Sequence, residues 1–247
     1  MAEKLKSALP VEETNENASE CWSCGDMRAA HFCSACGKVQ PPRPVDYFSF
    51  FGLPRRLNLD TARLEREFYE LSRRLHPDLA ARADRREQEW SLQQSSLLND
   101  AYRTLKNPVK RTRYLLQLEG LHLEEQSKTA TEKARAAGEM KKQVVPPGLL
   151  EEVFELNMQL EELRMQRKTG EDDPALVEEI GRQRLELEKK HESLLEELKG
   201  YWNQWDKLVD SGSEQDRRKV LDKMVDVLNR RNYIRNLVRD VNEVLEN

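Results

Sequence analysis

Four cysteines near the start of the chain have the spacing of a metal site. Cys21 and Cys24 form one C-x-x-C pair, Cys33 and Cys36 form a second, and eight residues separate the pairs. Two thiolates at this spacing can turn onto one ion, and two such pairs complete a tetrahedron. A glycine follows each pair, where a tight turn often needs positive φ. We therefore expect one structural zinc ion, with an iron–sulfur cluster and dithiol redox chemistry as the alternatives.

A closed four-thiolate site leaves no open coordination position, so this segment is expected to be structural and not catalytic. Residues 21–42 are too few to bury a core of their own, and bound metal would supply most of their stability. Trp22 and Phe32 are expected to form a small apolar patch over the cysteines. His31 is expected to lie on the surface of the hairpin.

A second group of residues, His76, Pro77 and Asp78, forms a polar turn. Asp60 is expected to cap the helix before it. Pro77 is expected to end that helix, because a proline keeps the preceding residue out of the α region. The apolar positions of the helix recur every three or four residues: Leu64, Phe68, Leu71 and Leu75. Its opposite face carries four basic side chains: Arg63, Arg66, Arg73 and Arg74.

Two more helical stretches follow the turn. One has its pattern at Leu92, Ser95, Leu98, Tyr102 and Leu105 and stops at Asn107-Pro108. The other is short, spans residues 114–118 and ends near Gly120. Residues 121–147 are polar and are expected to be a linker.

The remainder of the chain, residues 148–247, shows three apolar-periodic stretches with spacings of 3, 4 and 7. Each stretch predicts a helix with one apolar stripe, and three such helices can bury a shared seam in a three-helix bundle. No nucleophile lies beside a base in this region, and His191 is expected in the core or at its boundary. The predicted fold class is mostly α, with a small zinc-knuckle hairpin in front of the helices.

Composition and charge exclude several classes of protein. No apolar run approaches the roughly 20 residues of a spanning helix, and 10 Gly and 10 Pro are too few turn residues for a β-sandwich or barrel. Residues 43–120 hold 15 Lys and Arg against 11 Asp and Glu, whereas residues 121–247 hold 22 against 28. A basic middle and an acidic end suggest separate modules with separate partners.

Read together, three motifs resemble a known family. They are Arg-x-x-His-Pro-Asp, Leu-Asn-Asp-Ala-Tyr-Arg-Thr-Leu at residues 98–105, and Tyr-Leu-Leu-Gln-Leu-Glu-Gly at residues 114–120. Two antiparallel helices around a His-Pro-Asp turn resemble a J-domain, and these motifs are similar to the HscB (Jac) branch, which serves iron–sulfur cluster biogenesis. Some members of that branch carry a double C-x-x-C segment ahead of the J-domain.

The resemblance implies a co-chaperone that stimulates ATP hydrolysis by a DnaK- or HscA-type chaperone and delivers the iron–sulfur scaffold protein IscU to it. The chaperone contacts would be His76, Pro77 and Asp78 with the four arginines of the preceding helix. The implied scaffold contacts are Leu150, Phe154 and Glu155, with Tyr233 and Ile234 from the last helix. The family usually has an apolar residue at the position of Glu151.

The implied organisation is a tail at residues 1–20, a zinc segment at 21–42, a J-domain at 43–120, a linker at 121–147 and a scaffold-binding bundle at 148–247. Two alternatives stay open: a general zinc-containing J-domain co-chaperone for unfolded clients, and a nucleic-acid-associated zinc ribbon protein. We expect no enzymatic activity, no nucleic-acid or membrane partner, and at most weak self-association. The acidic start of the chain favours a bacterial cytoplasm over a mitochondrial matrix.

Overall fold

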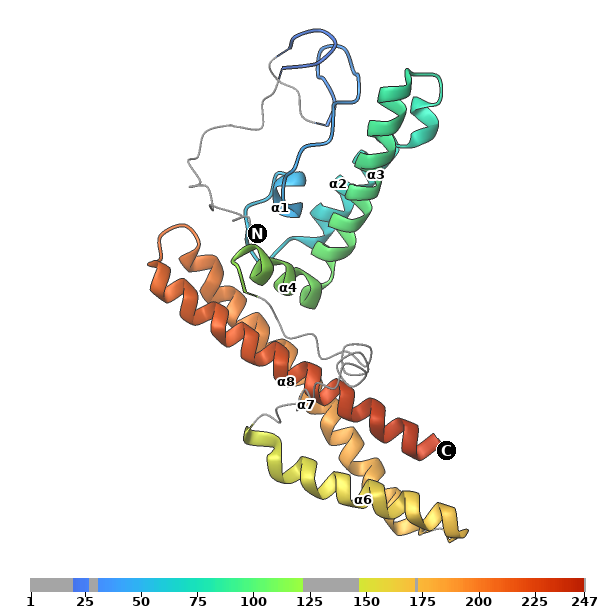
Figure 1. Ribbon diagram of the computed structural model, residues 1–247. Helices are drawn as coiled ribbons and strands as arrows, with labels where there is room; N and C mark the ends of the chain where they lie inside the picture. The colour runs from blue at the N-terminus through green and yellow to red at the C-terminus, as the bar shows by residue number, and fades with distance from the viewer. Residues whose placement is uncertain (1–19, 27–30, 122–146, 172, 247) are drawn as a thin grey trace, which may run out of the picture. The chain divides into compact units, whose positions relative to one another are not determined.

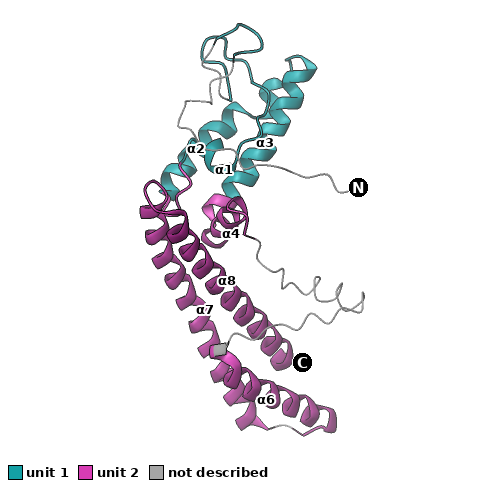
Figure 2. Ribbon diagram, turned by 60° about the vertical axis from the view of Figure 1, so that its left-hand side comes forward, with its two compact units in different colours: residues 1–53, 60–103 teal, residues 54–59, 104–247 magenta. Residues whose placement is uncertain are grey.

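The computed structural model describes residues 20–26, 31–121, 147–171 and 173–246, and the described part is mostly helical (Figure 1). Nearly all of the expected tail and of the expected linker lies outside these residues. Two compact units are distinguished by their internal contacts: residues 1–53 with 60–103, and residues 54–59 with 104–247 (Figure 2). The expected J-domain, residues 43–120, is divided between them, and its extent stays a prediction.

The first unit contains the cysteine segment, a short helix α1 (Tyr47–Phe50) and the long helices α2 (Thr61–Arg74) and α3 (Arg85–Lys106), of which α3 ends in the second unit. Between α2 and α3 lies a single 3₁₀ turn, η1 (Pro77–Ala80). The buried apolar side chains of this unit come from α1, α2, α3 and the turn: Phe48, Phe50, Phe51, Leu64, Leu75, Ala80, Leu98 and Ala101.

The ends of α2 follow from its sequence. The Asp60 carboxylate accepts the backbone N–H of Arg63 at 3.0 Å, which satisfies one of the free donors of the first turn. At the other end, His76 before Pro77 has an extended backbone with φ −61° and ψ 128°. Both expectations for this helix are confirmed.

The pattern in α3 is only partly confirmed. Leu98 and Leu105 are buried as expected, but Leu92 is 62% exposed. The positions that face inward beside it are polar, Ser91 and Gln94, and both are buried. These two side chains have hydrogen-bond partners in the first unit, which compensate for their loss of water.

The second unit contains α4 (Pro108–Leu118), a 3₁₀ turn η2 (Pro147–Leu149), and the helices α6 (Leu150–Thr169), α7 (Pro174–Leu208) and α8 (Glu214–Glu246). Asn107 caps α4, which therefore begins six residues before the short stretch that the sequence pattern indicated. α7 and α8 run side by side along much of their length, and α6 lies against the N-terminal part of α7 (Figures 1 and 2).

α6 and α7 bury one apolar stripe each, as the spacing predicts, whereas α8 buries a broader face that includes Asn232 and Asn236. In α6 the buried residues are Val153, Leu156, Leu160 and Leu163, and α7 contributes Ile180, Leu187, Leu194, Leu198, Trp202 and Trp205. α6 ends at Gly170, whose φ of 76° lies in the left-handed region that favours glycine. The Arg167 guanidinium donates to the carbonyl of Val244, and the Lys190 ammonium pairs with Glu152, so polar contacts also join the helices.

Candidate functional site

The four cysteine sulfur atoms come together at the start of the first unit. All four Sγ atoms lie within 4.8 Å of one another, with Cys21 and Cys36 3.7 Å apart and Cys24 and Cys33 3.5 Å apart. No other group of three or more potential ligands gathers in this way among the described residues. The arrangement can hold one metal ion.

Backbone hydrogen bonds build the two halves of the cluster in the same way. In the first pair, the Gly25 N–H donates to the Cys21 carbonyl at 3.0 Å, and in the second, the Gly37 N–H donates to the Cys33 carbonyl at 2.9 Å. Both glycines have positive φ, 77° and 73°, which explains their place after each pair. An antiparallel bridge between Phe32 and Val39 closes the second half.

The local environment shifts the pKa values of two of these thiols in opposite directions. Desolvation raises the pKa of Cys21, but hydrogen bonds from the backbone N–H groups of Ser23 and Cys24 outweigh it and lower the pKa to about 6. The backbone N–H of Asp26 lowers the pKa of Cys24, but the neighbouring thiols and desolvation together outweigh it and raise the pKa to about 12. Binding of a metal ion requires all four thiols to lose their protons, so the affinity for the ion depends on pH.

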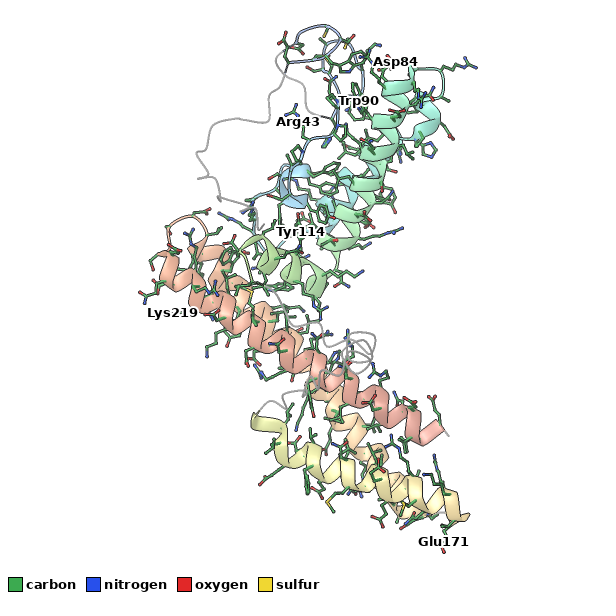
Figure 3. The ribbon with its side chains drawn as sticks, viewed as in Figure 1. Arg43, Asp84, Trp90, Tyr114, Glu171 and Lys219 are labelled. Atoms are coloured by element: carbon green, nitrogen blue, oxygen red, sulfur yellow. The ribbon has the colours of Figure 1, made fainter. Side chains whose placement is uncertain are left out.

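The cysteine segment packs against α2 and α3 within the first unit. Trp22 meets Trp90 of α3 edge to face, with ring centroids 5.4 Å apart, and the Trp90 side chain is labelled in Figure 3. The ammonium group of Lys38 lies 3.2 Å from the carboxylate of Glu87 on α3. Trp22, which packs on α3, and Phe32, whose ring lies under the Arg74 guanidinium of α2, thus help to attach the segment to the helices, a role that the sequence did not suggest.

His31 does not lie free on the hairpin surface, and that expectation was wrong. Its Nδ1 is 2.8 Å from Oε1 of Gln94, and its Nε2 is 2.9 Å from the carbonyl oxygen of Phe50. The amide nitrogen of Gln94 in turn donates to the carbonyl of Gln40 at 2.6 Å. His31 thus connects the cysteine segment to α1 and α3.

The His76-Pro77-Asp78 turn projects its polar side chains into solvent. The side chains of His76 and Asp78 are 56% and 89% exposed, and the adjacent Leu79 is 70% exposed. The Asp78 N–H donates to Nδ1 of His76 at 3.3 Å, and the Leu79 N–H donates to the His76 carbonyl at 2.9 Å. The turn is thus ordered by its own hydrogen bonds while its functional groups stay accessible.

The four arginines of α2 have different surroundings. Arg63 donates to Glu67 one turn later at 2.8 Å, and the guanidinium carbon of Arg74 lies 4.0 Å from the Phe32 ring centroid. Arg66 and Arg73 are exposed and form no ion pair with any residue that the structure describes. Arg74 is therefore engaged within its own unit, whereas Arg66 and Arg73 are available to a partner.

The expected contact residues of α6 lie on its outer face. Leu150 is 60% and Phe154 is 67% exposed, and Glu155 is exposed beside them. Met158 and Met165 continue the same exposed stripe at 60% and 67%. The spacing of 4, 4 and 7 from Leu150 could have indicated these two methionines from the sequence.

The two residues expected from the last helix lie elsewhere. Tyr233 is 6% and Ile234 is 2% exposed, so both belong to the core of the second unit. Burial raises the pKa of the Tyr233 hydroxyl, which agrees with its position. Direct contact of these side chains with a partner, which the resemblance implied, does not fit this placement.

The described helices include none that is long and apolar enough to cross a membrane. Together, the described residues define a class of protein. It is helical, with a four-cysteine cluster, an exposed His-Pro-Asp turn between two helices, and an apolar stripe on a separate helical unit. Comparison with known proteins agrees with this class.

No protein-family model matches the chain. The chain is 40% identical over 114 residues to the iron-sulfur cluster co-chaperone protein HscB of Mus musculus. This alignment covers 44% of this chain and 49% of that protein. It is also 30% identical over 149 residues to the HscB homolog of Arabidopsis thaliana. That alignment covers 60% of this chain and 53% of the Arabidopsis protein. The match thus spans about half the length of these curated relatives.

Among solved structures, the crystal structure of human co-chaperone protein HscB matches with a TM-score of 0.60 and 24% sequence identity. The match covers 91% of this chain and 97% of that chain, and at this identity it shows the shared fold. The resemblance to HscB co-chaperones and the mostly helical fold, both expected from the sequence, are confirmed.

Proposed function

We propose that this chain is an HscB-type co-chaperone that stimulates ATP hydrolysis by a DnaK- or HscA-type chaperone. The observation that carries the proposal is the exposed His76-Pro77-Asp78 turn between α2 and α3. The names of the curated relatives support it, as does the likeness of the fold to human HscB. In this role the chain performs no bond chemistry of its own, because the ATPase site belongs to the chaperone.

The charges of α2 suit the first stage of such an encounter. Arg66 and Arg73 are exposed, form no ion pair with the described residues, and can attract an acidic surface of the chaperone. Attraction between exposed charges acts mainly on the association rate and weakens as salt is added. Oriented contacts by His76 and Asp78 would then favour the hydrolysing state of the ATPase.

The second contact in the proposal is with an IscU-type scaffold protein, through Leu150, Phe154 and Glu155 on α6. Exposed apolar side chains on the outer face of a helix commonly mark a partner surface. The buried stripe of the same helix already packs on α7, so the outer stripe is not needed for the core. By holding the scaffold on one unit and the chaperone on the other, the protein would direct the chaperone to this client.

The metal in the proposal is zinc, one ion held by Cys21, Cys24, Cys33 and Cys36. Four thiolate ligands without a fifth group match the donor set of structural zinc sites. When bound, the ion would replace the thiol protons and fix the two halves of the segment against each other. The cellular location stays a prediction: the relatives reported above come from mouse and Arabidopsis, and a bacterial cytoplasm has no support from them.

The deciding experiment is a reconstituted ATPase assay with purified chaperone and scaffold. Single-turnover ATP hydrolysis is measured with the wild-type chain and with the His76→Gln variant. We expect strong stimulation by the wild type and none by the variant, whose circular dichroism and thermal unfolding should be unchanged because His76 is exposed. Equal stimulation by both proteins would refute the assignment.

A further inference from the structure

Two serine hydroxyls of α3 converge on the carbonyl group that directly precedes His76. The Ser91 hydroxyl donates to the Leu75 carbonyl oxygen at 2.9 Å, and the Ser95 hydroxyl donates to the same oxygen at 2.5 Å. Leu75 is fully buried and Ser91 is 1% exposed. Carbonyl groups in the last turn of a helix have no intrahelical donor. Here the two hydroxyls, one helical turn apart, supply both hydrogen bonds that a carbonyl oxygen can accept.

A third side chain of α3 holds the chain on the other side of the turn. The Gln88 amide nitrogen lies 3.3 Å from the carbonyl oxygen of Ala81 and 3.0 Å from that of Ala83. The backbone is therefore tied to α3 before His76 and again after the 3₁₀ turn. Between these two attachments the side chains of His76 and Asp78 remain exposed.

The bonds before the turn have a direct geometric consequence. Because the peptide unit is planar, fixing the direction of the Leu75 carbonyl also fixes the N–Cα direction of His76. Pro77 restricts the backbone of His76 from the other side. Little rotational freedom is left at the point from which the His76 side chain projects.

These serines are unusual among residues in the middle of a helix. A serine there commonly faces solvent or bonds a carbonyl of its own helix. Ser91 and Ser95 instead donate to a carbonyl across the α2–α3 pair, on the face where an apolar side chain would be expected. Packing alone does not require hydroxyl groups at these two positions.

We propose that Ser91 and Ser95 are positioning residues for the His-Pro-Asp turn, which hold the Leu75–His76 peptide in the orientation that the chaperone reads. The inference deepens the proposed function and rests on it. A turn that samples other orientations would still meet the chaperone, since the arginines of α2 are untouched. It would less often make the oriented contact that drives hydrolysis.

The test uses the full chain and compares the Ser91→Ala/Ser95→Ala double variant with the wild type in the chaperone ATPase assay. The maximal stimulated rate at saturating co-chaperone should fall by about tenfold or more, since small misplacements of an acting group have effects of this size. The co-chaperone concentration that gives half-maximal stimulation should stay within about twofold, because α2 is unchanged. Amide hydrogen exchange at Leu79, whose N–H bonds within the turn, should become faster.

Two further variants separate positioning from general stability. Ser95→Thr keeps a hydroxyl and should retain the wild-type rate, whereas Ser96→Ala alters an exposed neighbouring serine of α3 and should have no effect. Should the double variant fail to fold, Ser95→Ala alone, with the Ser91 bond intact, is expected to show a smaller fall in the maximal rate. An unchanged maximal rate, or a change in half-maximal concentration alone, would overturn the inference. Absence of stimulation by the wild type would instead refute the proposed function.

Discussion

The indole N–H of Trp202 on α7 donates a 2.9 Å hydrogen bond to the hydroxyl of Thr112 on α4. Both side chains are buried, and the guanidinium of Arg111, next to Thr112, lies 5.0 Å from the Trp202 ring centroid. Desolvation lowers the pKa of Arg111 to about 10. The helix that follows the Asn107-Pro108 stop is therefore attached to the C-terminal helices by specific polar contacts as well as by apolar packing.

Replacing Thr112 by valine should destabilise the protein by about 1–3 kcal/mol, because the buried indole N–H loses its acceptor while the volume hardly changes. The Thr112→Ser variant keeps the hydroxyl and serves as the control. Urea unfolding followed by tryptophan fluorescence measures the difference. A valine variant as stable as the wild type would show that this bond contributes nothing.

Removal of the metal should disorder the cysteine segment while the helices persist. A bound metal ion would supply most of the stability of so short a segment, whereas α2 and α3 share a core of their own. Because Trp22 packs edge to face on Trp90, chelation should change the near-ultraviolet circular dichroism and leave the far-ultraviolet signal nearly constant.

The Trp90→Phe variant provides the control for that measurement, since it should lose most of the near-ultraviolet change. Native mass spectrometry should find one zinc ion per chain, and Cys33→Ser should weaken its binding. A near-ultraviolet spectrum that does not change on chelation would contradict the expectation that the cysteine segment becomes disordered without the metal.

Truncation of Ile234 should lower the stability of the protein, whereas truncation of Leu150 and Phe154 should lower its affinity for a scaffold partner. Ile234→Ala removes a buried side chain and should cost about 2–5 kcal/mol of stability. Leu150→Ala with Phe154→Ala alters exposed side chains and should leave the free energy of unfolding within about 1 kcal/mol of the wild type. The same double variant should weaken binding of an IscU-type scaffold by about 2–4 kcal/mol.

Chemical denaturation and isothermal calorimetry measure these two quantities separately. Met158→Ala, one turn beyond Phe154 on the same face, tests how far the binding surface extends. Unchanged calorimetric affinity of the Leu150/Phe154 double variant would remove the outer face of α6 from the scaffold interaction.

His191 should make the protein more sensitive to acid. Burial lowers its pKa below the ordinary value of 6.5, and the charges of Arg231 and Arg235 lower it further, against the weaker opposing effect of Glu192. With a folded-state pKa below the unfolded-state value, the unfolded chain binds more protons below about pH 6.5, and stability falls as the pH decreases. His191→Gln should therefore reduce the loss of melting temperature between pH 7.5 and pH 5.5. An equal loss of melting temperature in the wild type and the variant would show that His191 does not contribute to the acid sensitivity.

Some features of the site could be predicted because they depend on nearby residues. The positive φ of Gly25 and Gly37, the cap at Asp60 and the end of α2 before Pro77 are consequences of local backbone sterics and local hydrogen bonds. Hydrophobic periodicity likewise predicted the three C-terminal helices, since each helix must bury one stripe.

Other features depended on contacts between residues far apart in the chain. Nothing near His31 in sequence indicates that Gln94 and the Phe50 carbonyl meet its ring. Arg74 has the same local pattern as Arg73, yet only Arg74 reaches the Phe32 ring. A periodic pattern also cannot distinguish which apolar residues of a long helix face a neighbour, and so Leu92, which fits the pattern of α3, is exposed.

The sequence alone therefore determined the cysteine cluster, the helices and the turn between α2 and α3, because short-range sterics and side-chain periodicity act within a few residues. Only the tertiary structure decided that the cysteine segment is attached to α2 and α3 and that two serines hold the peptide before His76. The reason is physical: these outcomes depend on which surfaces meet, and burial and hydrogen bonding between distant residues have no signature in local sequence.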